Sequence, residues 1–278
     1  SWVSASDGLP EPIGTRDPDM TAMTSAWDSF DAEAQKADGQ PILDLFAAEP
    51  DRLQRLTLEA AGLCLDLSKQ SWSKALFEAA LGLAKAADLD EARSRLFGGE
   101  VVNLSEGRAV LQTALRAPDG ADFKAKGEPV SAAVEAGRSA MAQFAKAVRS
   151  GTVRGATGLP FTAIVHIGIG GSDLGPRLVW EALRPLSPQI DLRFVANVDG
   201  SDIAAALDGL DPAQTLVIAV SKTFTTEETM ANALAARQWL AARLGDDRAG
   251  SHFAAVSAAP ARFVAFGVEP VRVFAFCD

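Results

Sequence analysis

Apolar residues in the first part of the chain recur at helical spacing. The runs 42–46, 56–67 and 73–87 place them three or four positions apart, which predicts helices. Breaks that carry Asp, Gly and Pro separate these runs. A polar segment rich in turn-forming residues, 117–129, follows them. We therefore expect a helical N-terminal region over residues 1–120.

From residue 121 the pattern changes to short apolar runs that alternate with amphipathic segments. Five runs predict strands: 161–167, 192–198, 215–220, 252–256 and 271–276. Helices are expected at 130–148, 174–183, 202–207 and 226–244, with a short one before the last strand. This alternation is typical of an α/β fold with a doubly wound parallel sheet, covered on both faces. We expect one such domain over residues 121–278.

Composition narrows the function classes. The chain has 278 residues, 26 Lys and Arg, 36 Asp and Glu, and a formal net charge of −10. Dispersed and outnumbered basic residues argue against nucleic-acid binding. No apolar run approaches the ~20 residues of a membrane helix, and the N-terminal residues carry no secretory-signal pattern. The two cysteines, Cys64 and Cys277, form no disulfide framework or metal-ligand spacing, so we expect a reducing, cytoplasmic setting.

A glycine-rich segment, GIGGSDLGP at 168–176, directly follows the predicted strand 161–167. In open parallel sheets, ligands bind beyond the carboxyl ends of strands. Glycine allows the backbone to approach a ligand closely, and amides at a helix start suit an anion. Gly171 and Ser172 are therefore candidate binding residues, and Pro176 is expected in the first turn of the following helix.

The competing interpretation of this segment is a dinucleotide fingerprint. Gly168 and Gly170 match its first two glycines, but Asp173 stands where the third belongs. The acid after the next strand, Asp199, also comes later than the ~20 residues expected. We therefore favour a sugar phosphate over the cofactor of an oxidoreductase. A purely structural turn stays an alternative.

A second unusual segment, SKTFTTEET at 221–229, follows the predicted strand 215–220. Its candidate binding residues are Ser221, Lys222, Thr223, Thr225 and Thr226. A phosphate monoester carries nearly two negative charges, which hydroxyls, helix amides and a lysine can satisfy. We predict a phosphate cradle. The alternative is a capping box of Thr225 and Glu228, which leaves residues 221–223 unexplained.

The two histidines carry weaker signals. His166 lies inside a predicted strand and is interpreted as a packed core residue. His252 opens another predicted strand, and the sequence shows no partner for it.

Together these two segments resemble the glucose-6-phosphate isomerase family. LDLSKQ at 65–70 and FGGEVVNLSEGRAVLQTALR at 97–116 resemble further family segments in the same order. The resemblance implies an aldose-ketose isomerase of glycolysis and gluconeogenesis that interconverts glucose 6-phosphate and fructose 6-phosphate, without metal or cofactor. It implies two sugar-isomerase (SIS-type) domains, of which residues 121–278 are the first, and a homodimer of the complete protein.

The resemblance also assigns roles to residues. The phosphate would be held by Ser221, Thr223 and Thr226, with Lys222 beside them. Gly171 and Ser172 would face the sugar phosphate. Glu228 would lie near the family's ring-opening histidine, behind the groups that touch the substrate.

Two departures from the family matter. Gln112 stands where the family commonly has a histidine. The family's glutamate base, and the histidine and lysine associated with ring opening, would follow Asp278. We therefore expect no catalytic residue in this chain, and binding without turnover. The alternative is a non-catalytic sugar-phosphate-binding module.

Overall fold

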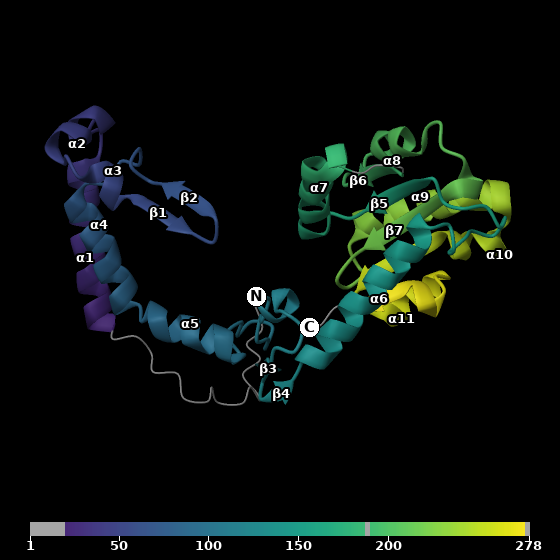
Figure 1. Cartoon of the computed structure of the whole chain (residues 1–278), viewed down its shortest axis with the longest axis horizontal. Helices are drawn as coiled ribbons and strands as arrows, with labels where there is room; N and C mark the ends of the chain where they lie inside the picture. The colour runs from purple at the N-terminus through teal and green to yellow at the C-terminus, as the bar shows by residue number, and fades with distance from the viewer. Residues whose placement is uncertain (1–19, 187–189, 276–278) are drawn as a thin grey trace, which may run out of the picture. The chain divides into compact units, whose positions relative to one another are not determined.

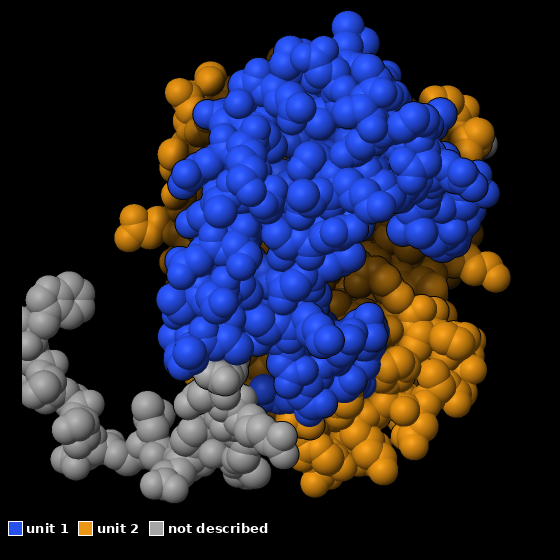
Figure 2. All heavy atoms as spheres, turned by 90° about the vertical axis from the view of Figure 1, so that its left-hand side faces the viewer, with its two compact units in different colours: residues 1–97 blue, residues 98–278 orange. Residues whose placement is uncertain are grey.

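The chain forms two compact units, residues 1–97 and 98–278, which are coloured separately in Figure 2. The structure is a computed structural model that describes residues 20–186 and 190–275. Figure 1 shows the elements of each unit in chain order. The two units divide between residues 97 and 98. The sequence instead predicts a domain boundary at residue 120, and that boundary stays a prediction.

The first unit is mainly helical, as expected. It contains α1 (Met20–Ala37), α2 (Ile42–Ala48), α3 (Arg52–Arg55), α4 (Lys74–Ala86) and α5 (Leu89–Gly98), and α1 packs along α4. The hydroxyl oxygen of Ser73 accepts from the Leu76 amide and caps α4. The predicted helices at 42–46 and 73–87 are therefore present.

The helix predicted over 56–67 is wrong. This segment forms an antiparallel hairpin of β1 (Thr57–Ala60) and β2 (Leu63–Asp66). The turn residues Ala61 and Gly62 have φ of 52° and 77°, a backbone that a helix cannot contain. On each side of this turn the leucines alternate at period two, the spacing of a strand.

The second unit is built on a parallel five-stranded sheet of order β6-β5-β7-β8-β9. Its strands are β5 (Ala163–Ile167), β6 (Asp191–Val195), β7 (Thr215–Val220), β8 (Phe253–Ser257) and β9 (Val273–Ala275). All five predicted strands are confirmed within the described residues, with bounds shifted by a few positions. The short strands β3 (Lys124–Ala125) and β4 (Glu128–Pro129) pair with each other and lie outside this sheet.

Helices cover both faces of the sheet. Val165, Val217 and Phe253 pack under α8 (Gly200–Leu207), α9 (Glu227–Leu244) and α11 (Pro260–Phe266). Leu216 and Ala254, on the opposite face, pack against α6 (Ser131–Arg149). α7 (Gly171–Leu183) lies over the same face as α6, because both helices line one cavity with Ile164 and Ile218. The predicted doubly wound α/β fold is confirmed.

The strand order has a topological switch point at one place in the sheet. The chain leaves β5 for β6 on one side and then returns to β7 on the other side of β5. In open α/β sheets, a ligand binds where successive connections diverge in this way, outside the carboxyl ends of the two strands. The neighbouring strands β5 and β7 form that switch point.

Candidate functional site

The two segments singled out in the sequence meet at this switch point. Ile167, the last residue of β5, pairs in parallel register with Ala219 of β7. The glycine loop, residues 168–172, and the hydroxyl loop, residues 221–226, therefore leave the same edge of the sheet from adjacent strands. The structure confirms that each segment follows a strand, and it adds that the two strands are neighbours.

The glycine loop has a backbone that only glycine adopts easily. Gly170 has φ 59° and ψ −119° and is the N-cap of α7, so the start of this helix has no side-chain cap. A Cβ at Gly168 would lie 2.5 Å from the carbonyl oxygen of Ser172. Gly171 is exposed, and a Cβ there would meet no atom within 4 Å. The amides of Ser172, Asp173 and Leu174 donate to the carbonyls of Ile169, Gly170 and Gly170 at 3.1, 3.0 and 2.9 Å, so the open position lies beside Gly171 itself.

Asp173 is engaged within the helix. Its carboxylate is buried and pairs with Arg177, one turn along, at 2.9 Å. The Arg177 guanidinium lies 4.8 Å from the ring centre of Phe194 on β6. Asp173 therefore supports the first turn of α7 and its arginine partner.

The expected place of Pro176 is wrong. α7 begins at Gly171 rather than near residue 174, so Pro176 lies inside the helix. Proline has no amide hydrogen to donate to the carbonyl of Ser172, four residues earlier. That carbonyl is instead 2.8 Å from Nε2 of His166. His166 is buried, as predicted for a core residue, and burial lowers the pKa of its imidazole.

The hydroxyl loop has a rigid backbone. The Ser221 amide donates to the Val256 carbonyl at 3.1 Å. The Lys222 carbonyl accepts from Ser257 Oγ at 3.1 Å and from the Ala258 amide at 3.0 Å. These contacts fasten the loop to the end of β8, the next strand of the sheet.

Phe224, within the same loop, was missed by the sequence analysis. It has φ 48°, which is uncommon for a residue with a side chain. Its ring is buried and stacks on Phe263 with 3.8 Å between centres, and its amide donates to Ser221 Oγ at 3.0 Å. Left-handed backbone of this kind costs about 1–3 kcal/mol and concentrates at ligand-binding sites. Burial of the ring holds the loop in this conformation.

The structure does not contain the capping box of Thr225 and Glu228 that was the alternative to the phosphate cradle. The N-cap of α9 is Thr226, and no side chain caps this helix. The Thr225 hydroxyl lies 2.6 Å from that of Thr223, and Glu228 sits in the first turn of α9. Thr223, Thr225 and Thr226 are exposed, so their hydroxyls and the first amides of α9 can donate hydrogen bonds to an anion.

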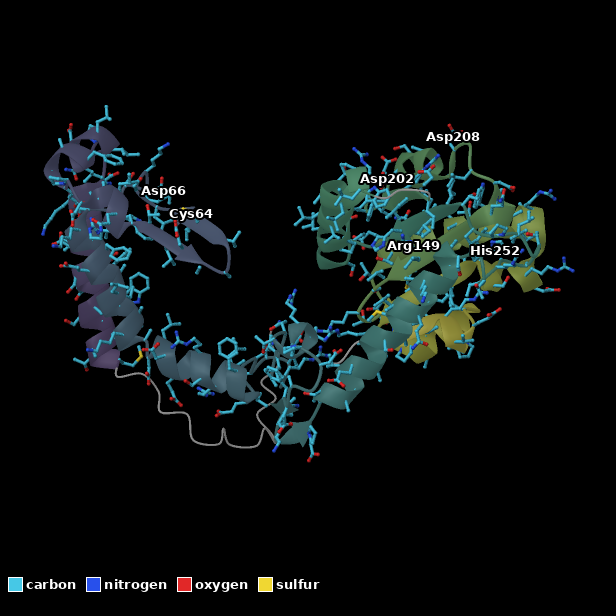
Figure 3. All side chains as sticks on the ribbon, viewed as in Figure 1. Cys64, Asp66, Arg149, Asp202, Asp208 and His252 are labelled. Carbon is cyan, nitrogen blue, oxygen red and sulfur yellow. The ribbon has the colours of Figure 1, made fainter. Side chains whose placement is uncertain are left out.

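The backbone amides that follow the third strand of this region, β6, are already hydrogen-bonded to a side chain. After β6, the Asp202 carboxylate accepts from the amides of Ala196 and Asn197, both at 3.0 Å. Asp199 caps α8 through the Ser201 amide, a bond that lowers the pKa of its carboxyl group. Figure 3 labels Asp202 in α8. Asp199 therefore has a structural role here in place of the ribose contact that a dinucleotide site requires.

Lys222 has a charged partner that the sequence analysis did not identify. Its Nζ lies 3.0 Å from Oε2 of Glu106, which also lies 3.3 Å from the Arg108 guanidinium. The hydrogen bond from Lys222 is the main reason that the pKa of the Glu106 carboxyl is lowered. The family resemblance covers this segment, but nothing in the sequence pairs Glu106 with Lys222.

A cavity of about 340 Å³ lies beside this ion pair. Lys222, Glu106, Asn103 and Gln112 contribute its polar lining together with Arg108. Gln112, which departs from the family pattern, therefore lines the same cavity as Lys222. This volume falls in the range of small-molecule sites.

A larger cavity of about 640 Å³ lies elsewhere, on the sheet face beneath α6 and α7. Its lining is mainly apolar and includes Phe144, Trp180 and Leu216. No candidate binding residue lines it. Lys146, Arg149 and Ser150 also line it, but neither of the two loops does, so we place the candidate site at the switch point.

His252 has partners that the sequence could not reveal. The ring is fully buried, with Nδ1 2.9 Å from the Thr215 carbonyl, while Nε2 accepts from the Ala156 amide at 2.9 Å (Figure 3). These bonds define a neutral tautomer, and burial lowers the pKa of the imidazole. The residue ties a loop to β7.

The described part of the chain offers neither a metal-ligand cluster nor a membrane-spanning helix. No group of three or more His, Cys, Asp or Glu residues there could hold a metal ion. No helix there is long and apolar enough to cross a membrane. Cys64 is exposed on β2 (Figure 3), and Cys277 lies outside the described residues.

The fold is that of a doubly wound α/β protein, with its candidate site at the β5/β7 switch point. Residues 66–278 match the family model for phosphoglucose isomerase. This match covers more than half of the chain, so the chain belongs to the phosphoglucose isomerase family.

The relatives carry one name. A glucose-6-phosphate isomerase of Caulobacter vibrioides is 60% identical over 93% of this chain, and one of Deinococcus deserti is 47% identical over 92%. The crystal structure of a glucose-6-phosphate isomerase from Chlamydia trachomatis shares the fold, with a TM-score of 0.70, 24% identity and 94% of this chain covered. The chain spans 48%, 47% and 48% of these three proteins, about half of each.

Proposed function

We propose that this chain contains the phosphate-binding part of a glucose-6-phosphate isomerase. The observation that carries the proposal is the meeting of two loops at the β5/β7 switch point, each at the start of a helix without a side-chain cap. An oxygen-rich dianion can take hydrogen bonds from both helix starts at once. The family membership of the chain supports a sugar phosphate as that anion.

Each candidate residue has a role in this proposal. The hydroxyls of Ser221, Thr223, Thr225 and Thr226 and the charge of Lys222 bind the phosphate. The Gly171 and Ser172 backbone faces the sugar. Glu228, in the first turn of α9, acts behind these groups.

The reaction of the complete protein is the interconversion of glucose 6-phosphate and fructose 6-phosphate. Moving a proton between C2 and C1 needs a positioned base, and general acid-base groups contribute ~10²–10⁴ in rate. This chain contributes the phosphate anchor, which fixes the sugar relative to that base. We assign the proton transfer itself to no residue of residues 1–278, and we expect the complete protein to act as a cytoplasmic homodimer that uses neither metal nor nucleic acid.

The test combines calorimetry with an isomerase assay on the 278-residue chain. We expect fructose 6-phosphate to bind, fructose to fail to bind, and turnover to be absent. Glu228→Gln is the control for residual acid-base chemistry, and it should leave binding intact. Turnover near that of a full-length family member would contradict our placement of the chemistry, and failure of fructose 6-phosphate to bind would contradict the phosphate site.

A further inference from the structure

His166 is a buried polar residue that the proposed binding scheme does not use. It lies in β5, two positions before the glycine loop, and its side chain is largely hidden from solvent. Its ring packs 5.1 Å from the ring centre of Phe194 on β6. Its Nε2 lies 2.8 Å from the carbonyl oxygen of Ser172, at the start of α7.

This hydrogen bond exists because of a gap in the helix. The Ser172 carbonyl would ordinarily accept from the amide four residues later, but that residue is Pro176. A carbonyl can only accept, so Nε2 of His166 carries the hydrogen. The Ser172 carbonyl oxygen is crowded, because a Cβ at Gly168 would lie 2.5 Å from it. A carbonyl shielded from water is costly when it has no donor.

The ring is held in the form that makes this bond. Burial lowers the pKa of the imidazole and favours the neutral ring, while the ion pair of Asp173 and Arg177 stands beside it. A neutral ring with hydrogen on Nε2 is a fixed donor, because the strand and the Phe194 contact both restrict its rotation.

We propose that His166 is a positioning residue for sugar-phosphate binding: its Nε2–H fixes the Ser172 carbonyl and thereby the Gly171–Ser172 backbone that faces the sugar. The inference rests on the proposed function, in which these two residues face the ligand. His166 itself does not touch the ligand. The hydroxyl loop, which is fastened separately to the end of β8, does not depend on it.

The experiment compares two substitutions in the 278-residue chain. His166→Gln can keep a donor near the position of Nε2, whereas His166→Met fills similar space without one. Calorimetry measures the affinity for fructose 6-phosphate and for inorganic phosphate, and hydrogen exchange measures the protection of amides 169–174. We expect His166→Met to weaken fructose 6-phosphate roughly five- to tenfold, to spare inorganic phosphate, and to speed exchange in the loop. His166→Gln should behave like the parent.

A second variant protects the test against misfolding. Pro176 is exposed, and Pro176→Ala supplies the missing helical amide to the Ser172 carbonyl. In that background, His166→Met should lose much less affinity and protection. This rescue would distinguish the hydrogen bond from general packing around His166.

The failures are distinguishable. If the parent chain binds no fructose 6-phosphate, the proposed function fails, while hydrogen exchange still tests the positioning role. If the parent binds and His166→Met matches it in affinity and exchange, the positioning role is overturned. Equal damage in His166→Gln and His166→Met, without rescue by Pro176→Ala, would also overturn it.

Discussion

At the scale of single residues, the charge on Lys222 should dominate phosphate binding. Charge-assisted hydrogen bonds contribute about 1.5–3 kcal/mol each, so Lys222→Ala should weaken fructose 6-phosphate roughly 10- to 100-fold. Calorimetry on the 278-residue chain measures this. Equal dissociation constants in the two forms would remove the phosphate cradle.

Glu106→Gln is the matched control for Lys222. It removes the carboxylate 3.0 Å from Nζ but leaves the lysine charged. An exposed ion pair contributes little to stability, and an incoming phosphate is repelled by the carboxylate. We therefore expect Glu106→Gln to bind fructose 6-phosphate as tightly as the parent or a few-fold more tightly. Weaker binding would mean that Glu106 positions the lysine.

A side chain at Gly171 should block the approach of the ligand to the backbone. The structure has room for a Cβ there, with no atom within 4 Å, so Gly171→Val should fold normally. We expect at least a tenfold loss in affinity for fructose 6-phosphate, an increment of about 1.4 kcal/mol, with an unchanged melting curve. Unchanged affinity would show that the glycine loop is a structural turn only.

At the scale of elements, Arg52 holds the segment after the hairpin. Its guanidinium is fully buried and donates to the carbonyls of Ser68, Gln70 and Trp72 at 2.7, 2.5 and 2.6 Å. It also pairs with Glu49 at 2.9 Å. One side chain thus joins the short helix α3 to residues 68–72.

Removing this side chain should loosen the first unit. Arg52→Met leaves three carbonyls without this donor and removes one partner of the Glu49 carboxylate, and breaking a buried pair costs about 3–5 kcal/mol. Urea unfolding, with hydrogen exchange over residues 57–76, measures the loss. Arg55→Met is the control: Arg55 pairs with the same carboxylate, but the described hydrogen bonds fasten it to no carbonyl, so a much smaller change is expected. Equal effects would contradict the role given to Arg52.

At the scale of the whole molecule, two buried histidines should make the fold sensitive to mild acid. Burial lowers the pKa of both His166 and His252 below the ordinary value of 6.5. Below that pH the unfolded chain binds protons that the folded chain does not. The contribution of the two histidines to the free energy of unfolding should therefore be fully present above pH 6.5 and be lost as the pH falls below it.

Melting temperatures between about pH 5 and pH 8 test this, since the linkage acts between the folded and unfolded pKa values. His166→Gln keeps a donor but cannot titrate, so its melting temperature should fall less steeply over this range. The exposed carboxyl groups with lowered pKa values, such as that of Glu106, act at more acidic pH. A melting temperature that is flat from pH 7 to about pH 5 would contradict the prediction.

The sequence by itself determined the sheet and the location of the candidate site. The strands of the second unit are continuous apolar runs, because a parallel strand covered on both faces needs no polar side. The glycine and hydroxyl segments stand directly after such runs, so their place at strand ends is a local property of the chain. Helical spacing of apolar residues, which is also a local signal, predicted the helices α4 and α6.

Only the tertiary structure decided what these segments contact. The strand order β6-β5-β7 makes the two loops neighbours, and spacing along the chain does not encode that order. Glu106 meets Lys222 across 116 positions, and His252 meets Ala156 across 96. Phe224 takes its left-handed backbone because its ring stacks on Phe263, and the 56–67 segment turns back as a hairpin. The Glu106, His252 and Phe224 contacts join residues far apart in the sequence, and such contacts outweigh a local preference of about 1 kcal/mol or less per residue.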